Sequence, residues 1–122
     1  MGEMDLQVLL RTMEPVQFPE PYGFAVWEGD LPRDVFATVA EVEGLTVVAP
    51  LSVLGGGDPW ARISLTVHSD LAAVGLTAAF AGALGREGIS CNVIAGVHHD
   101  HLFVQWDRRF DAMAALEGLS RA

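Results

Sequence analysis

The fold is decided by RISLTVHSDLAAVGLTAAFAGALGREGISCNVIAGVHHDHLFVQW, which spans residues 62–106. Its first residues, Arg62–His68, alternate apolar and polar side chains with the period of a half-buried strand. Ser69 and Asp70 are residue types that cap helices, so a helix is predicted over Leu71–Arg86. A strand followed directly by a helix is therefore the first expectation.

Gly88 follows this helix at the place where a C-terminal glycine commonly ends one. The next segments, Ile89–Ala95 and His101–Trp106, are predicted strands. Asp107 is then predicted to cap a last helix that ends near Gly118. The order β-α-β-β-α is typical of ferredoxin-like α+β folds, in which helices pack on one face of an antiparallel sheet.

The N-terminal part is predicted to be less regular. Val35–Val42 contains helix-forming residues, but its alternation favours the first arm of a hairpin. The expected elements are a helix over Leu6–Met13 capped by Asp5, a strand over Tyr22–Trp27, a hairpin over Val35–Val42 and Leu45–Ala49, and one helical turn over Leu51–Leu54. Gly55-Gly56-Gly57 is the most flexible point, so we expect two lobes, residues 1–57 and 58–122.

Composition excludes several classes of protein. The 122 residues are 51% hydrophobic and 19% charged, which argues against disorder. The net charge is −9 with dispersed basic residues, so we expect neither nucleic acid nor an anionic membrane as partner. No residue is lysine, which excludes Schiff-base chemistry, pyridoxal phosphate anchoring and a P-loop lysine, and we expect no cofactor.

Targeting and redox signals are also missing. Cys91 is the only cysteine, so no intrachain disulfide can form, and its expected role is that of a buried small hydrophobe. The first ten residues have no basic region before their apolar run, unlike a signal peptide. A cytoplasmic location is therefore predicted.

The predicted helix Leu71–Arg86 carries no charge before Arg86 and is rich in alanine and glycine. A helix without a polar face is normally buried on most sides. We therefore expect a second lobe or a second subunit to cover its outer face, which predicts a homo-oligomer.

The same residues resemble the ACT domain, a small ligand-sensing module attached to many enzymes of amino-acid metabolism. The resemblance rests on Ser69–Gly75 followed by Glu87–Ser90, and on HSDLAAVGLTAA, ISCNVIAG and HDHLFV. Glu43–Thr46 fits the N-terminal half of small stand-alone ACT proteins. The resemblance implies two tandem ACT-like lobes, an oligomer and no known reaction. One departure is that no Asp-x-Pro-Gly loop follows Asp70.

Two candidate sites follow, each with a plainer alternative. The first is an amino-acid site at the start of the predicted helix, where free N–H groups attract a carboxylate and Asp70 faces the ammonium group. Its residues are Ser69, Asp70, Val74, Gly75, Leu76, Thr77 and Asn92. The alternative is that Ser69 or Asp70 only caps the helix.

The second candidate is the run His98-His99-Asp100-His101, whose side chains suit a transition metal. On a strand, His99 and His101 would share one face and His98 and Asp100 the other, and His68 would join the cluster if its strand were adjacent. The alternative is a polar hairpin turn without a metal.

The function expected from these observations is non-catalytic, a regulatory sensor of an amino acid or similar small molecule. The two alternatives are a metal-binding protein or enzyme that uses His98–His101, and a structural protein-interaction module.

Overall fold

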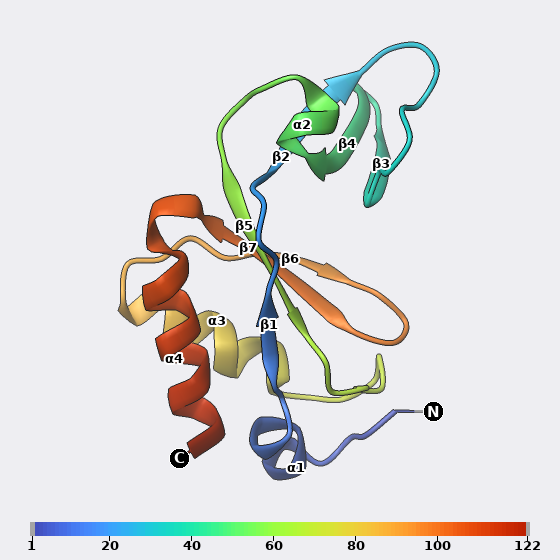
Figure 1. Cartoon of the computed structure of the whole chain (residues 1–122). Helices are drawn as coiled ribbons and strands as arrows, with labels where there is room; N and C mark the ends of the chain where they lie inside the picture. The colour runs from blue at the N-terminus through green and yellow to red at the C-terminus, as the bar shows by residue number, and fades with distance from the viewer. Residues whose placement is uncertain (1, 122) are drawn as a thin grey trace. The chain divides into compact units, whose positions relative to one another are not determined.

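The computed structural model describes residues 2–121 (Figure 1). The chain forms two compact units. The first unit combines the N-terminal segment, which ends at Phe18, with the segment that begins at Ala61, and the second unit is Pro19–Trp60. The division of the sequence into lobes 1–57 and 58–122 stays a prediction.

The C-terminal part of the first unit has the predicted β-α-β-β-α order. Its elements are β5 (Trp60–Leu65), α3 (Leu76–Arg86), β6 (Asn92–Ala95), β7 (Asp100–Gln105), the 3₁₀ turn η1 (Trp106–Arg108) and α4 (Arg109–Arg121). β6 and β7 pair antiparallel with Asn92 opposite Phe103 and Ala95 opposite Asp100, and β7 lies between β6 and β5. The α+β class with an antiparallel sheet is confirmed.

The N-terminal segment completes this unit. Helix α1 (Leu6–Arg11) begins where predicted, because the Asp5 carboxylate accepts the N–H groups of Gln7 and Val8. The strand β1 (Pro15–Gln17) was not predicted. It has three residues, begins with proline and pairs antiparallel with β5, about fifty residues later in the chain, so local sequence carries little signal for it.

Helices and strands of the first unit share one core. Most of its buried side chains come from three helices and two strands, and they include Leu9, Ile63, Phe80, Val104 and Leu116. Because α1, α3 and α4 all contribute to this cluster, they cover the same face of the strands.

The predicted start of α3 is wrong. The helix begins at Leu76, and Gly75 occupies its N-cap position with φ of 101°. Asp70 instead forms a turn of its own, because its carboxylate accepts the Ala72 N–H at 2.8 Å and its carbonyl accepts the Ala73 N–H at 2.9 Å. Neither Ser69 nor Asp70 caps α3, and residues 71–75 form a loop despite their alanine content.

The other end of α3 is as predicted. Gly88 has φ of 72°, and the N–H of Ile89 returns to the carbonyl of Leu84 at 3.0 Å. Asp107, however, does not cap the last helix. It lies inside η1, and α4 begins at Arg109 and passes Gly118.

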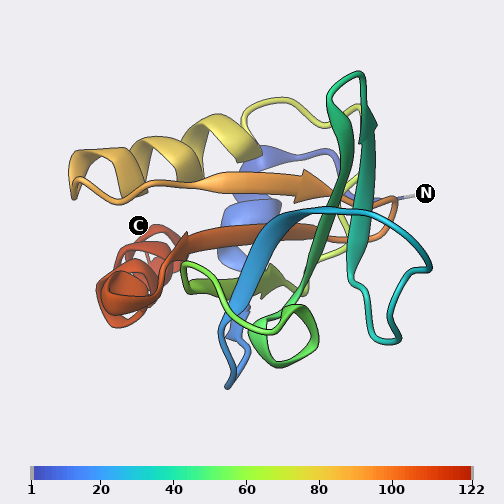
Figure 2. The ribbon, with the colours of Figure 1, turned by 90° about the horizontal axis from the view of Figure 1, so that it is seen from above.

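The second unit contains β2 (Tyr22–Trp27), β3 (Ala37–Glu41), β4 (Gly44–Pro50) and α2 (Leu51–Leu54). β4 pairs antiparallel with both β3 and β2, and the tight β3–β4 hairpin is visible in teal in Figure 2. The predicted hairpin is therefore confirmed, and the alternative of a helix over Val35–Val42 is wrong. Val47, Val48 and Ala49 are buried between the flanking strands, which explains the apolar run of β4.

Within residues 2–121, none of the helices has the length and apolar character that crossing a membrane requires.

Candidate functional site

The loop between β5 and α3 is held in place by the N-terminal segment. The N–H of Glu3 donates to the carbonyl of His68 at 2.8 Å, and the N–H of Asp70 donates to the carbonyl of Glu3 at 2.9 Å. A side chain at Gly2 would meet the backbone nitrogen of Asp70 at 2.4 Å. This short parallel pairing fixes the backbone of the loop before α3 begins.

A cavity of about 90 Å³ lies between this loop, the start of α3 and the β6–β7 hairpin. Its lining residues are Ser69, Asp70, Leu71, Ala73, Leu76, Thr77, Ala95 and Asp100. Four of the predicted ligand residues, Ser69, Asp70, Leu76 and Thr77, therefore lie together.

The remaining predicted residues lie elsewhere. The Val74 side chain is 83% exposed, and Gly75 packs against Leu6 of α1, where an added Cβ would lie 3.0 Å from a Leu6 methyl group. Asn92 is exposed at the start of β6, at the end of the hairpin opposite to Ala95. These three residues do not line the cavity.

Sequence reasoning did not include Asp100 in this site. It lines the cavity because β6 and β7 pair so that Asp100 stands opposite Ala95. Burial raises the pKa of Asp100, and the nearby charge of His99 opposes part of that rise. The sequence did single out the run His98–His101, which contains Asp100. Only the register of the β6–β7 hairpin, however, shows that Asp100 lines the cavity.

The cavity has two kinds of polar group. The carboxyl groups of Asp70 and Asp100 suit a cationic group such as an ammonium ion. Leu76 and Thr77 form the first turn of α3, which no described side chain caps, so backbone N–H groups at this end suit an anion. Such a pair of groups matches a zwitterion.

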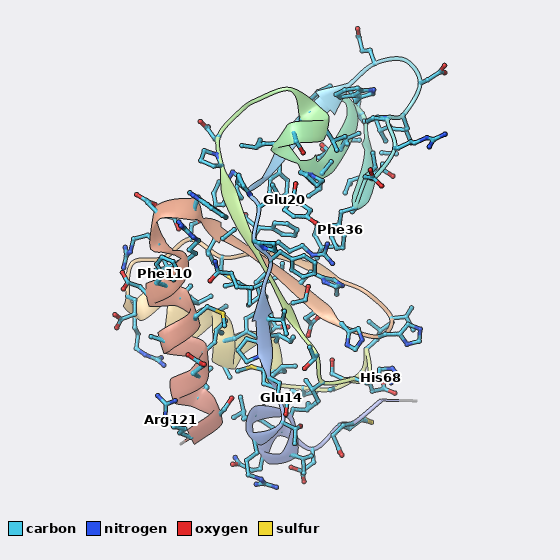
Figure 3. All side chains as sticks on the ribbon, in the orientation of Figure 1. Glu14, Glu20, Phe36, His68, Phe110 and Arg121 are labelled. Atoms are coloured by element: carbon cyan, nitrogen blue, oxygen red, sulfur yellow. The ribbon has the colours of Figure 1, made fainter. Side chains whose placement is uncertain are left out.

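Three histidines gather beside this loop. The rings of His68 and His98 have centroids 5.0 Å apart, and that of His99 lies 6.3 Å from each. Nε2 of His68 lies 3.4 Å from Nδ1 of His98. His68, labelled in Figure 3, thus joins the hairpin histidines as expected if its segment were adjacent.

His101 is separate from this group. Its Nδ1 lies 2.7 Å from Oγ of Ser64 on the neighbouring strand, whereas Nδ1 of His99 lies 3.3 Å from the carbonyl of Val67. The predicted pairing of His99 with His101 is therefore replaced by the pairing of His68 with His98. Within residues 2–121, no three His, Cys, Asp or Glu side chains are grouped closely enough to hold a metal ion.

Burial lowers the pKa of His101 to about 4, helped by the positive charges of Arg62 and His99. The imidazole is therefore neutral at pH 7. Nε of Arg62 donates to Oγ of Ser64 at 3.3 Å, and the same hydroxyl forms a hydrogen bond with Nδ1 of His101. Ser64 is only 8% exposed, which makes this trio a structural link between strands.

The β-α-β-β-α unit with its small cavity defines a ferredoxin-like α+β module. An ACT domain model matches residues 1–53 and a second one matches residues 56–118. The chain therefore belongs to the ACT-domain family, and the resemblance inferred from the sequence is confirmed. ACT domains are generally regulatory modules that bind small molecules and commonly oligomerise.

Two solved structures are similar to this chain. One is a protein of unknown function from Vibrio cholerae, described as a possible transport protein, with 42% identity, a TM-score of 0.79, and coverage of 91% of this chain and 92% of that one. The other is a protein from Agrobacterium tumefaciens with 17% identity, a TM-score of 0.68, and coverage of 83% and 84%; it shares the fold. A comparison with curated proteins found no match.

Proposed function

We propose that this protein is a non-catalytic regulatory sensor that binds a free amino acid in the cavity at the start of α3. The observation that carries the proposal is the placement of two carboxyl groups, Asp70 and Asp100, in the same cavity as the uncapped first turn of α3. The carboxyl groups bind the ammonium group of the ligand, and the N–H groups of Leu76 and Thr77 donate hydrogen bonds to its carboxylate.

The size of the cavity limits the ligand. Its volume is about 90 Å³, well below the roughly 300–1,000 Å³ that is typical of small-molecule pockets. That space holds the ammonium and carboxylate groups with a small side chain. We therefore propose glycine, alanine or serine as ligand, in preference to aromatic or long amino acids.

Ligand binding would be communicated through a second copy of the chain. Thr77, Ala78 and Gly85 of α3 are exposed, so the helix presents a face of small residues on which another helix can approach closely. We propose a homo-oligomer that uses this face. A ligand that binds one packing of the subunits better than another shifts the equilibrium between them.

The test is thermal unfolding of the full chain with each of the twenty amino acids. A ligand at 100 times its Kd adds about 2.7 kcal/mol to stability, a shift of several degrees for a protein of this size. Asp70→Asn keeps an oxygen that accepts the Ala72 N–H, so the loop turn survives while the charge is lost. Asp100→Asn removes the second charge, and both variants are expected to lose the shift.

Asp111→Asn is the control, because Asp111 is exposed on α4 and pairs only with Arg108 in the described structure. It should keep the full response. If none of the twenty amino acids changes the unfolding temperature of the wild type, amino-acid sensing is wrong. The interaction-module alternative would then be pursued by identifying a binding partner.

A further inference from the structure

We propose that His68 and His98 bind one zinc ion, through Nε2 of His68 and Nδ1 of His98. This site differs from the predicted pairing of His99 with His101, and neither of its two histidines lines the proposed amino-acid cavity.

The distance between the two nitrogen atoms carries the proposal. Nε2 of His68 and Nδ1 of His98 are 3.4 Å apart. Zinc–nitrogen bonds of about 2.0–2.1 Å in a tetrahedron place two ligand nitrogens about 3.3–3.4 Å from each other. The two imidazoles therefore already stand at the separation that a tetrahedral zinc ion requires. An octahedral ion with bonds of about 2.1 Å would require nitrogens only about 3.0 Å apart.

The site has room for the ion and its remaining ligands. A second cavity, of about 230 Å³, is lined by Gly2, His68, Asp70, Leu71, Val97 and His98. Because the described residues contain no group of three side chains close enough to hold a metal, two of the four zinc positions would be occupied by water. Zinc ions that meet an exogenous ligand keep one position open to water or substrate, and this ion would keep two.

Both histidines are attached to ordered backbone. The carbonyl of His68 accepts the Glu3 N–H at 2.8 Å, and the hairpin tip that carries His98 is closed by the Gly96 N–H, which donates to the carbonyl of His99 at 2.9 Å. Nδ1 of His99 lies 3.3 Å from the carbonyl of Val67, which links the tip to the loop. Both imidazoles are therefore carried by backbone segments that hydrogen bonds hold in place.

The competing explanation for the 3.4 Å contact is a hydrogen bond from one imidazole to the other. In that case one ring donates its proton and the other accepts it. Zinc would take the lone pairs of both nitrogens, and the ring that had donated its proton would carry that proton on its other nitrogen instead. Only the metal explanation predicts a change in the protein when zinc is added.

The experiment is a calorimetric titration of the chelator-treated full chain with zinc chloride. The wild type should bind one equivalent of zinc. His68→Ala and His98→Ala should each weaken binding by more than the roughly 10–100-fold that is lost with an outer partner of a metal ligand, because each variant removes one of the two protein ligands. His101→Asn is the matched control, because His101 contacts Ser64 rather than this pair, and it should bind zinc as the wild type does.

Circular dichroism of each metal-free variant verifies that it is folded before titration. Cobalt(II) is the second probe, because four-coordinate tetrahedral cobalt absorbs visible light strongly. The wild type and His101→Asn should develop this absorption, and His68→Ala and His98→Ala should not. Absence of zinc binding by the wild type, or alanine variants that bind zinc as tightly as the wild type does, would overturn the proposal. These readouts need no amino acid, so they are independent of the sensor proposal.

Discussion

The hydroxyl oxygen of Ser64 lies 2.7 Å from Nδ1 of His101, and the two residues belong to neighbouring strands, β5 and β7. Arg62 donates to the same hydroxyl. A half-buried neutral imidazole is thus part of the contact between two strands that supply much of the core.

This contact predicts a pH dependence of stability. The pKa of His101 falls from 6.5 to about 4 in the folded protein, so between these values the unfolded chain binds more protons than the folded chain. The contribution of His101 is complete above about pH 6.5 and is lost as the pH falls towards 4. Urea unfolding at pH 7, 5.5 and 4.5 should show this loss, and His101→Asn should flatten it. An unchanged slope in the variant would assign the loss to other groups.

Alanine is predicted to have opposite effects on stability at two glycines, one at the N-cap of α3 and one inside the helix. Gly75 has φ of 101° and lies against Leu6, so Gly75→Ala should destabilise the protein by about 1–2 kcal/mol. Gly85 is helical, and no described atom lies within 4 Å of an added Cβ, so Gly85→Ala should stabilise it by about 0.5–1 kcal/mol. Denaturant unfolding measures both. Equal effects would mean that the backbone at Gly75 is not constrained.

The cap of α1 is a third prediction. The Asp5 carboxylate accepts the N–H groups of Gln7 and Val8 at 2.9 and 3.2 Å, so Asp5→Ala should cost about 1 kcal/mol. Glu117→Ala, on the exposed surface of α4, is the matched control and should change stability by less than about 0.5 kcal/mol. A loss of similar size in both variants would point to net charge rather than to the cap.

Cys91 should be slow to react. Burial raises the pKa of its thiol from 9.0 to about 11, which lowers the reactive thiolate fraction at pH 8 on the order of 100-fold. Alkylation by iodoacetamide should be slower than that of free glutathione by a similar factor in native buffer and should match it in denaturant. Rapid reaction of the native protein would show that the thiol is more accessible than its packing indicates.

The sequence predicted those elements whose signals are local. The strand Tyr22–Trp27 has the predicted bounds, and the hairpin of β3 and β4 follows from alternation and a turn. The start of α3 was wrong because alanine-rich residues indicate helix, whereas the Asp70 turn and the positive φ of Gly75 keep them in a loop. At these residues, the specific backbone geometry overrides the local helix propensity.

The candidate site was predictable only in part, for the same reason. Ser69, Asp70, Leu76 and Thr77 are close in sequence and line one cavity. Asp100 joins them only through the β6–β7 register. The meeting of His68 with His98 likewise depends on how a loop and a hairpin tip approach each other across thirty residues.

The place of β1 has a consequence for how this chain can be shortened. Gln17 is paired with Ile63, and the N–H of Phe18 donates to the carbonyl of Arg62 at 2.9 Å. The chain therefore leaves the first unit and re-enters it at adjacent positions, so the second unit is an insertion in the sequence of the first. Replacing residues 19–60 by a short reverse turn would join β1 to β5 as an ordinary hairpin. We expect the first unit to fold on its own as one continuous, shorter chain.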